Sequence, residues 1–219
     1  MPENFNIHEP IYNNIESEVD RLSYSVCFDD DQLNTYSSQI TELILRIAVE
    51  IEAISIELYQ KHCENPKTNI SYESAIKEIN KTFKLDKTPI MVTSESSYFS
   101  DDKRILFPFN DWDSWEHKEG GGNMIFGDWH CAYQMLKHNN LNDKYLTMKR
   151  YGTLRYLIKI CAALFLLNFI RSDSRRLMLN SKVFSVIQKS DNGQYGIWSR
   201  SYSGRYVSLD EKLIEIINK

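Results

Sequence analysis

The stretch DWHCAYQMLKHNNLNDKYLTMKRYGTLRYLIKICAALFLLNFIR, residues 128–171, decides the fold that this sequence predicts. Its second part predicts a long helix from about Asp143 to Ser172, because apolar residues follow one another at helical spacing. The most apolar run, Ile160 to Ile170, is too short to cross a bilayer and is typical of a buried core helix. Its first part belongs to a helix predicted from about Met124 to Asn139, and an asparagine-rich break separates the two.

A second long helix is predicted toward the N-terminus, from about Gln32 to His62. One face carries apolar residues at the helical period, and a second stripe is expected to widen the buried surface: Ile40, Leu43, Ile44, Ile47, Ile51, Ile54 and Leu58, then Leu45, Val49, Ile56 and Tyr59. Glu52 falls within this second stripe. Because burying a lone carboxylate is costly, Glu52 is expected to have a partner.

The remaining patterns predict smaller elements. Short helices are expected at about 11–24, 72–83 and 209–218, with two short strands at 90–93 and 104–107 around a polar turn at 100–102. A β-hairpin or small sheet is expected at 183–207, with a turn at 190–193. The fold class is therefore mainly α: a single helical domain over residues 1–219. We expect a β-containing insertion at about 88–123 and a C-terminal β-hairpin appendage at about 180–219.

The charge is unevenly distributed, although the net charge of the chain is only -4. Residues 1–70 contain 13 acidic and 4 basic residues, whereas residues 137–190 contain 11 basic and 2 acidic residues. Such a basic block is suited to an anionic partner such as RNA, and Arg175 and Arg176 are candidate binding residues within it. The alternative is that the block faces the acidic N-terminal part of the same fold.

Other features exclude several classes of protein. The four cysteines form no C-x-x-C pair, and the N-terminus is polar and acidic, so a reduced cytoplasmic protein without a membrane span is predicted. The adjacent pairs His62-Cys63 and His130-Cys131 point about 100° apart on a helix, which suits no joint zinc site. No P-loop or dinucleotide-binding fingerprint occurs. No metal and no cofactor is therefore predicted.

One dense polar cluster stands out in the opening stretch. Trp129, Tyr133 and Lys137 lie four residues apart and share one helical face, followed by His138 and Asn139. In a structural interpretation, the aromatic residues pack and Lys137 or His138 pairs with Glu52. In a functional interpretation, His138 is a general acid or base and Lys137 holds an anion.

The pattern Trp-x3-Tyr-[Asn/Gln]-x2-Lys-His, with Gln134 at the variable position, resembles a signature found in some bacterial HEPN-like proteins. The helix from Ser38 onward, with its Glu-x-Glu step at Glu50 and Glu52, resembles the early helix of those proteins, and the resemblance spans about 35–173. HEPN domains are up-and-down helical bundles, commonly dimeric, of toxin–antitoxin, phage-defence and RNA-processing systems. The resemblance implies a homodimer, with RNA or a protein such as an antitoxin as partner. It also implies that Glu50 or Glu52 faces the Lys137-His138 pair.

Many HEPN proteins are metal-independent RNases, and the active members carry an Arg followed by four to six residues and a His. Counting back from His138, the matching positions hold Cys131, Ala132 and Tyr133. Three hypotheses follow: a noncanonical metal-independent RNase that uses His138 and Lys137, a non-catalytic interaction or dimerisation module, and a small-molecule enzyme with a pocket at the loop around 120–122. Trp129, Tyr133, Asn139, Glu50 and Glu52 are the predicted binding residues of the site.

Overall fold

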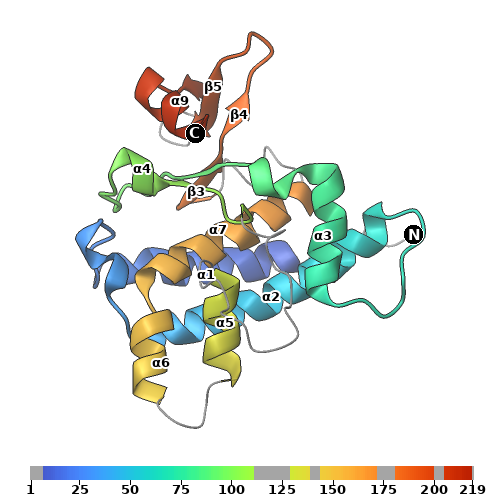
Figure 1. Cartoon of the computed structure of the whole chain (residues 1–219). Coiled ribbons are helices and arrows are strands. Elements are labelled where there is room, and N and C mark those ends of the chain that lie inside the picture. Colours follow the sequence, from blue (N-terminus) through green and yellow to red (C-terminus); the bar gives the residue numbers. More distant parts are fainter. Residues whose placement is uncertain (1–6, 111–128, 139–143, 172–180, 200–204, 219) are drawn as a thin grey trace. The chain divides into compact units, whose positions relative to one another are not determined.

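The structure is a computed structural model of the 219-residue chain. It describes residues 7–110, 129–138, 144–171, 181–199 and 205–218, and this part is mainly helical, with eight α-helices and six short strands (Figure 1). The chain divides into two compact units. Unit 1 comprises residues 1–33, 88–107 and 164–219, and unit 2 comprises residues 34–87 and 108–163.

Unit 2 contains the helices that carry the candidate site: α2 (Ser38–His62), α3 (Tyr72–Phe83), α5 (Trp129–His138), α6 (Lys144–Tyr151) and the first part of α7 (Leu154–Arg171). Within the unit, α2 contacts α3, α5 and α6, and α5 contacts α6 (Figure 1). The short 3-10 helix η2 (Leu85–Lys87) follows α3. Serine side chains cap both α2 and α3, with Ser37 accepting from the Ile40 amide and Ser71 from the Ser74 amide.

The predicted long helix at 32–62 is confirmed as α2, but it begins later than expected. A separate 3-10 helix, η1 (Asp31–Asn34), precedes it, and residue Tyr36 lies in an isolated β-bridge with Thr153. The main apolar face is buried as predicted. The second stripe is wrong in one place, because Val49 is 60% exposed.

The single helix predicted at 143–172 is wrong, because the chain breaks between α6 and α7. The Leu154 amide donates to the carbonyl of Thr35 at 2.9 Å, so the α7 N-terminus is held by backbone outside the helix. A Cβ on Gly152 would lie 2.2 Å from Oγ1 of Thr41, so only glycine fits this close approach. These two contacts join the break to the segment before α2 and to the first turn of α2.

Unit 1 contains α1, the second part of α7 and the β elements. Besides that part of α7, its helices are α1 (His8–Leu22), α4 (Asp101–Arg104) and α9 (Glu211–Ile217). Its strands are β1 (Ile90–Val92), β2 (Ile105–Leu106), β3 (Phe184–Val186), β4 (Gln188–Lys189), β5 (Tyr195–Ser199) and β6 (Arg205–Ser208). The strands form two antiparallel three-stranded sheets, in the orders β2-β1-β3 and β4-β5-β6. α1 and α9 correspond to the first and last of the predicted short helices.

The predicted pairing of the strands near 90 and 105 is confirmed, with Ile90 opposite Leu106. The polar turn expected between them is wrong in part, because residues 101–104 form α4. The predicted C-terminal β segment does not form one sheet. β3 instead pairs with β1, placing Ser185 opposite Met91, while β4, β5 and β6 form the second sheet. The predicted turn is confirmed, and Gly193 supplies its positive φ of 84°.

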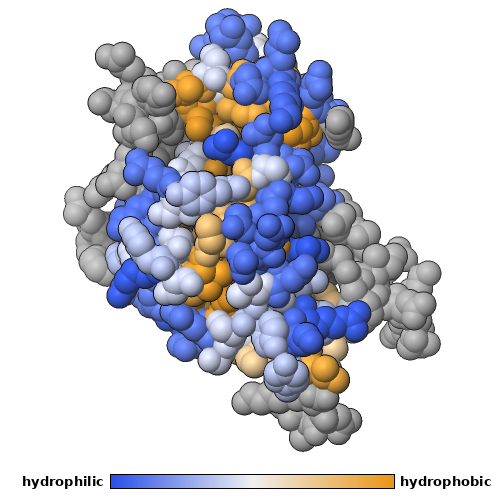
Figure 2. Space-filling model, turned by 90° about the vertical axis from the view of Figure 1, so that its left-hand side faces the viewer, coloured by the Kyte–Doolittle hydropathy of each residue, from blue (hydrophilic) through white to orange (hydrophobic). Residues whose placement is uncertain are grey.

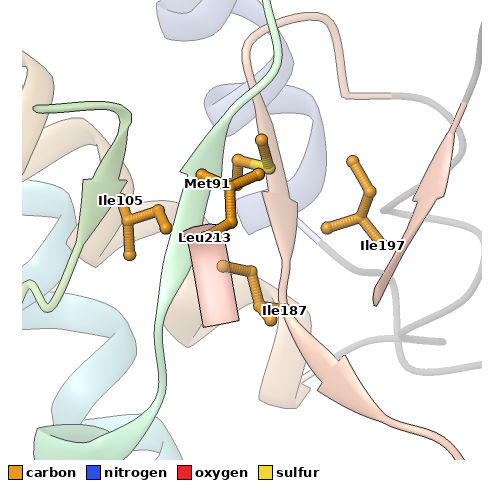
Figure 3. Close-up of a cluster of buried hydrophobic side chains, with 5 residues drawn as sticks. All are labelled: Met91, Ile105, Ile187, Ile197 and Leu213. Atoms are coloured by element: carbon orange, nitrogen blue, oxygen red, sulfur yellow. The ribbon is translucent and has the colours of Figure 1, made fainter. Parts of the chain in front are cut away.

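The β elements of unit 1 share a small hydrophobic core with the last helix. Its buried members come from β1, β2, β5, α9 and the residue between β3 and β4: Met91, Ile105, Ile197, Leu213 and Ile187 (Figure 3). The Asp210 side chain caps α9 by accepting from the Leu213 amide at 2.9 Å. Burial of Leu213 therefore anchors the end of the chain to both sheets.

On the face of the molecule drawn in Figure 2, hydrophilic side chains surround smaller hydrophobic areas. Seven large apolar or aromatic side chains are exposed in the described residues: Ile7, Ile11, Tyr24, Val49, Tyr98, Tyr145 and Leu146. Within the described ranges, every helix falls short of the length and apolarity that crossing a membrane requires.

Candidate functional site

Three side chains of unit 2 form a connected polar cluster between α2 and α5. Lys137 Nζ donates to Tyr133 Oη at 2.8 Å, and Tyr133 Oη donates to Glu52 Oε1 at 2.7 Å. Lys137 Nζ also lies 3.6 Å from Glu52 Oε1. We call Glu52, Tyr133 and Lys137 the Glu52 cluster. It supplies the partner that the position of Glu52 in the apolar stripe requires.

The Glu52 cluster lies at the boundary between the core and solvent. Tyr133 is 2% exposed, whereas the side chains of Lys137 and Glu52 are 43% and 29% exposed. Burial raises the pKa of Tyr133, so its hydroxyl stays protonated at neutral pH and donates to the carboxylate. The hydrogen bond with Tyr133 raises the pKa of Lys137, and the Glu52 charge adds to this effect. Lys137 therefore stays protonated, and the cluster places its ammonium, paired with the Glu52 carboxylate, at the surface.

A second polar row connects α5 to α3. Gln134 Nε2 donates to Tyr72 Oη at 3.1 Å and lies 3.3 Å from His130 Nε2. His130 Nε2 lies 3.6 Å from Glu73 Oε1. The hydrogen bond with His130 is the largest cause that lowers the pKa of Glu73, to about 2, and burial raises the pKa of Tyr72. His130 and Gln134 face α3 while Tyr133 and Lys137 face α2, as spacings of four residues allow.

The structure places the other predicted site residues differently. Trp129 is 1% exposed, and its Nε1 donates to the Pro108 carbonyl at 2.7 Å. His138 is exposed at the end of α5, and no hydrogen bond or ion pair joins it to another described residue. Glu50 is buried on α2. Asn139, Arg175 and Arg176 lie outside the described residues, as does the loop around 120–122.

Sequence reasoning missed two residues of α3 that contribute to the second polar row, Tyr72 and Glu73. It named His130 only as half of a His-Cys pair and Gln134 only as a signature position. A signal for the second row was present, because His130 and Gln134 lie four residues apart, as Tyr133 and Lys137 do. Which helix each pair faces depends on tertiary packing, and no spacing rule reveals that.

Exposed cations lie at the end of α5 and on α6, two helices that pack against each other in unit 2 (Figure 1). Neither helix contains an Asp or Glu. We define the α5–α6 basic surface by the exposed residues Lys137, His138, Tyr145, Lys149 and Arg150. Cations that share a surface with an exposed aromatic ring are typical of nucleic-acid-binding faces.

In the described part of the chain, no group of three or more His, Cys, Asp or Glu side chains gathers as metal ligands do. The chain matches no known protein family, no curated protein and no solved structure. What the site can do therefore follows from its geometry. An ammonium has three N–H donors, and Lys137 donates one to Tyr133 and lies 3.6 Å from Glu52 Oε1, so at least one N–H remains for an external anion.

Proposed function

We propose that this chain is an HEPN-like, RNA-associated protein whose RNA contacts are made by the α5–α6 basic surface. The observation that carries this proposal is the exposure of Lys137, Lys149 and Arg150 on two packed helices that contain no carboxylate. No carboxylate on these two helices competes with a phosphate oxygen for these cations, and Lys137 is paired with Glu52 of α2. The Trp129–His138 signature supports a place in a bacterial defence or toxin–antitoxin type system, with a second copy or an antitoxin as protein partner.

The proposed reaction is metal-independent RNA cleavage in which a 2′-hydroxyl loses its proton and attacks the adjacent phosphate. The P–O5′ bond breaks, and the 5′-oxygen leaves as a hydroxyl after taking up a proton, which produces a 2′,3′-cyclic phosphate. His138 is exposed and supplies the acid–base group, which such a step requires. Lys137, held in place by Tyr133 and Glu52, supplies positive charge to the developing phosphorane through its remaining N–H. The arrangement is noncanonical, because lysine replaces the arginine of active HEPN RNases and neighbours the histidine in the chain.

The cleavage proposal is tested by incubating mixed cellular RNA, without added metal, with the wild type, His138→Ala and Lys137→Ala. His62→Ala is the matched control, because His62 is also exposed and also ends a helix of unit 2. We expect both site variants to lose at least 100-fold in rate, as loss of a general acid or base does, while the control keeps the wild-type rate. Equal rates in all four proteins, with folding intact, would remove the Lys137-His138 pair from the reaction.

RNA association is tested separately from cleavage, by measuring binding against salt concentration. Replacing Lys149 and Arg150 with Gln removes two phosphate partners. The negative slope of log association constant against log salt concentration should therefore become shallower by about 1.4 for single-stranded RNA. The matched control replaces Lys61 and Lys67, which are exposed elsewhere in unit 2, with Gln and should keep the wild-type slope. An unchanged slope in the Lys149/Arg150 variant would show that RNA binds elsewhere.

One observation favours a second function, a non-catalytic HEPN-like interaction module. Lys137 donates to Tyr133 and pairs with Glu52, and Tyr133 donates to Glu52, so the Glu52 cluster also connects α2 to α5. In that case Lys137→Ala lowers the melting temperature, and neither the wild type nor any variant cleaves RNA. This combination of results distinguishes the module from the nuclease.

A further inference from the structure

The α5–α6 basic surface carries an aromatic pair that phosphate binding alone does not explain. Tyr145 on α6 is 56% exposed, and its hydroxyl oxygen lies 2.8 Å from that of Tyr36. The two rings meet edge to face, with centroids 6.1 Å apart and an interplanar angle of 79°. The hydroxyl contact restricts the rotation of an exposed ring. Tyr145 is therefore held in place while much of its surface stays open to solvent.

The backbone on both sides of this pair is also held. Tyr36 forms a β-bridge with Thr153, and the Leu154 amide donates to the Thr35 carbonyl at 2.9 Å. Thr153 lies two residues after the end of α6, the helix that carries Tyr145. Gly152 permits the close approach that this junction needs. The break between α6 and α7 thus positions Tyr145 beside Tyr36, and a ring fixed before binding loses little entropy when a ligand stacks on it.

The surroundings of Tyr145 favour an anionic ligand with a flat ring. Lys149 lies four residues after Tyr145, so both project from the same side of α6, and both are exposed. The hydrogen bond with Tyr145 raises the pKa of Tyr36, so the pair stays neutral and does not repel phosphate. A nucleotide joins a flat base to a phosphate, which matches a tyrosine ring next to a lysine.

We infer that Tyr36 and Tyr145 form a stacking platform for an unpaired base, which makes single-stranded RNA the preferred ligand of the α5–α6 basic surface. This inference rests on the proposed function and names its substrate class. Bases within a duplex are already stacked on their neighbours, so a surface tyrosine reaches a base face only in single strands, loops and ends. Lys149 then contacts the phosphate of the stacked nucleotide or of its neighbour.

The test measures binding of one RNA sequence as a single strand and as a duplex, with 2-aminopurine in place of one adenine. We expect Tyr145→Leu to weaken single-strand binding about tenfold or more, as loss of one stacked base does, and to leave duplex binding unchanged. Wild type should quench 2-aminopurine fluorescence in the single strand, and Tyr145→Leu should not. Leu146→Ala is the matched control, because the adjacent Leu146 is 57% exposed and has no ring.

Tyr145→Phe and Tyr36→Phe separate stacking from positioning. Both variants keep two aromatic rings and lose the hydroxyl contact, so each should bind single strands more weakly than wild type and more tightly than Tyr145→Leu. One result would overturn the platform and leave the proposed function standing. In it, Tyr145→Leu binds single strands as tightly as wild type, while the Lys149/Arg150 variant shows a reduced salt slope. A wild type that binds no RNA in either form would overturn both.

Discussion

Two glutamates, one in each unit, accept a hydrogen bond from a tyrosine hydroxyl at the same distance, and their surroundings differ. In unit 1, Tyr12 donates to Glu16 at 2.7 Å, and in unit 2, Tyr133 donates to Glu52 at 2.7 Å. Glu16 is 2% exposed, whereas the Glu52 side chain is 29% exposed. The same local contact is thus used once in the interior and once at the edge of a surface.

The further partners of each carboxylate show what the difference means. Oε1 of Glu16 also accepts from Ser181 Oγ at 2.5 Å and from the Val183 amide at 3.1 Å, so neutral donors join α1 to the start of β3. Glu52 is instead paired with Lys137, whose charge reaches solvent. A buried carboxylate surrounded by donors of its own chain holds a fold together. One that positions an exposed cation also prepares a site for a ligand.

The largest expected effect in this comparison is that of Glu16→Leu on stability. The substitution leaves three donors without their acceptor, those of Tyr12, Ser181 and Val183, in a buried position. Because each unsatisfied buried donor costs roughly 1–3 kcal/mol, the free energy of unfolding should fall by about 3 kcal/mol or more. Urea unfolding measures this change directly.

Asp20→Leu is the control for Glu16→Leu, because Asp20 is a half-buried acidic residue on the same helix. Its effect should stay within about 0.5 kcal/mol, as is usual away from buried networks. Equal effects of the two substitutions would mean that the hydrogen bonds of Glu16 contribute nothing to stability. In that case Glu16 and Glu52 would differ only in how exposed their side chains are.

A smaller effect is expected for the Glu52 cluster, measured as a double-mutant cycle. Glu52→Gln and Lys137→Met remove the two charges separately and together, and the coupling energy should be about 0.5–1 kcal/mol. Because the pair is partly exposed, the coupling should shrink as salt rises from low to near-molar concentration. The cost of Glu16→Leu should not depend on salt in this way. A coupling of zero at low salt would show that Tyr133 alone satisfies Glu52.

The sequence predicted the part of the site that depends on local periodicity. Glu52 stood out as a carboxylate in an apolar stripe, and Lys137 was one of two residues named as its partner, which the structure confirms. Glu16 was not singled out. Its spacing of four residues from Tyr12 is visible in the sequence, but Ser181 lies 165 residues away and only folding brings it close.

The same limit explains the errors in the fold. The helical period runs through residues 143–172 without interruption, and a glycine inside a helix costs only about 1 kcal/mol, so nothing local predicts the break. The break exists because Gly152 approaches Thr41 and Leu154 bonds to Thr35, which are tertiary contacts. The pairing of β1 with β3 is likewise non-local, because α5, α6 and α7 lie between the two strands in the sequence.

Glu73 provides a third carboxylate with which to sharpen the comparison, and its effect is expected to be the smallest. The hydrogen bond with His130 lowers the pKa of Glu73 from 4.5 to about 2. A lowered pKa in the folded state means that the stabilisation is present above about pH 4.5 and is lost as pH falls toward 2. Because the side chain is 34% exposed, solvent screening should keep the effect under about 1 kcal/mol.

The measurement for Glu73 compares urea unfolding of wild type and Glu73→Gln at several pH values from 5 to 2.5. The difference in free energy of unfolding should be largest at pH 5 and should shrink steadily toward pH 2.5, because Glu73 becomes protonated in the unfolded chain below its ordinary pKa of 4.5 while it stays mostly ionised in the folded protein. Glu64→Gln, in the exposed turn after α2, should change stability little at any of these pH values. A difference for Glu73→Gln that stays constant with pH would mean that its carboxylate contributes no charge-dependent contact. The row from His130 to Glu73 would then serve packing alone, and of the two polar rows along α5 only the Glu52 cluster would depend on charge.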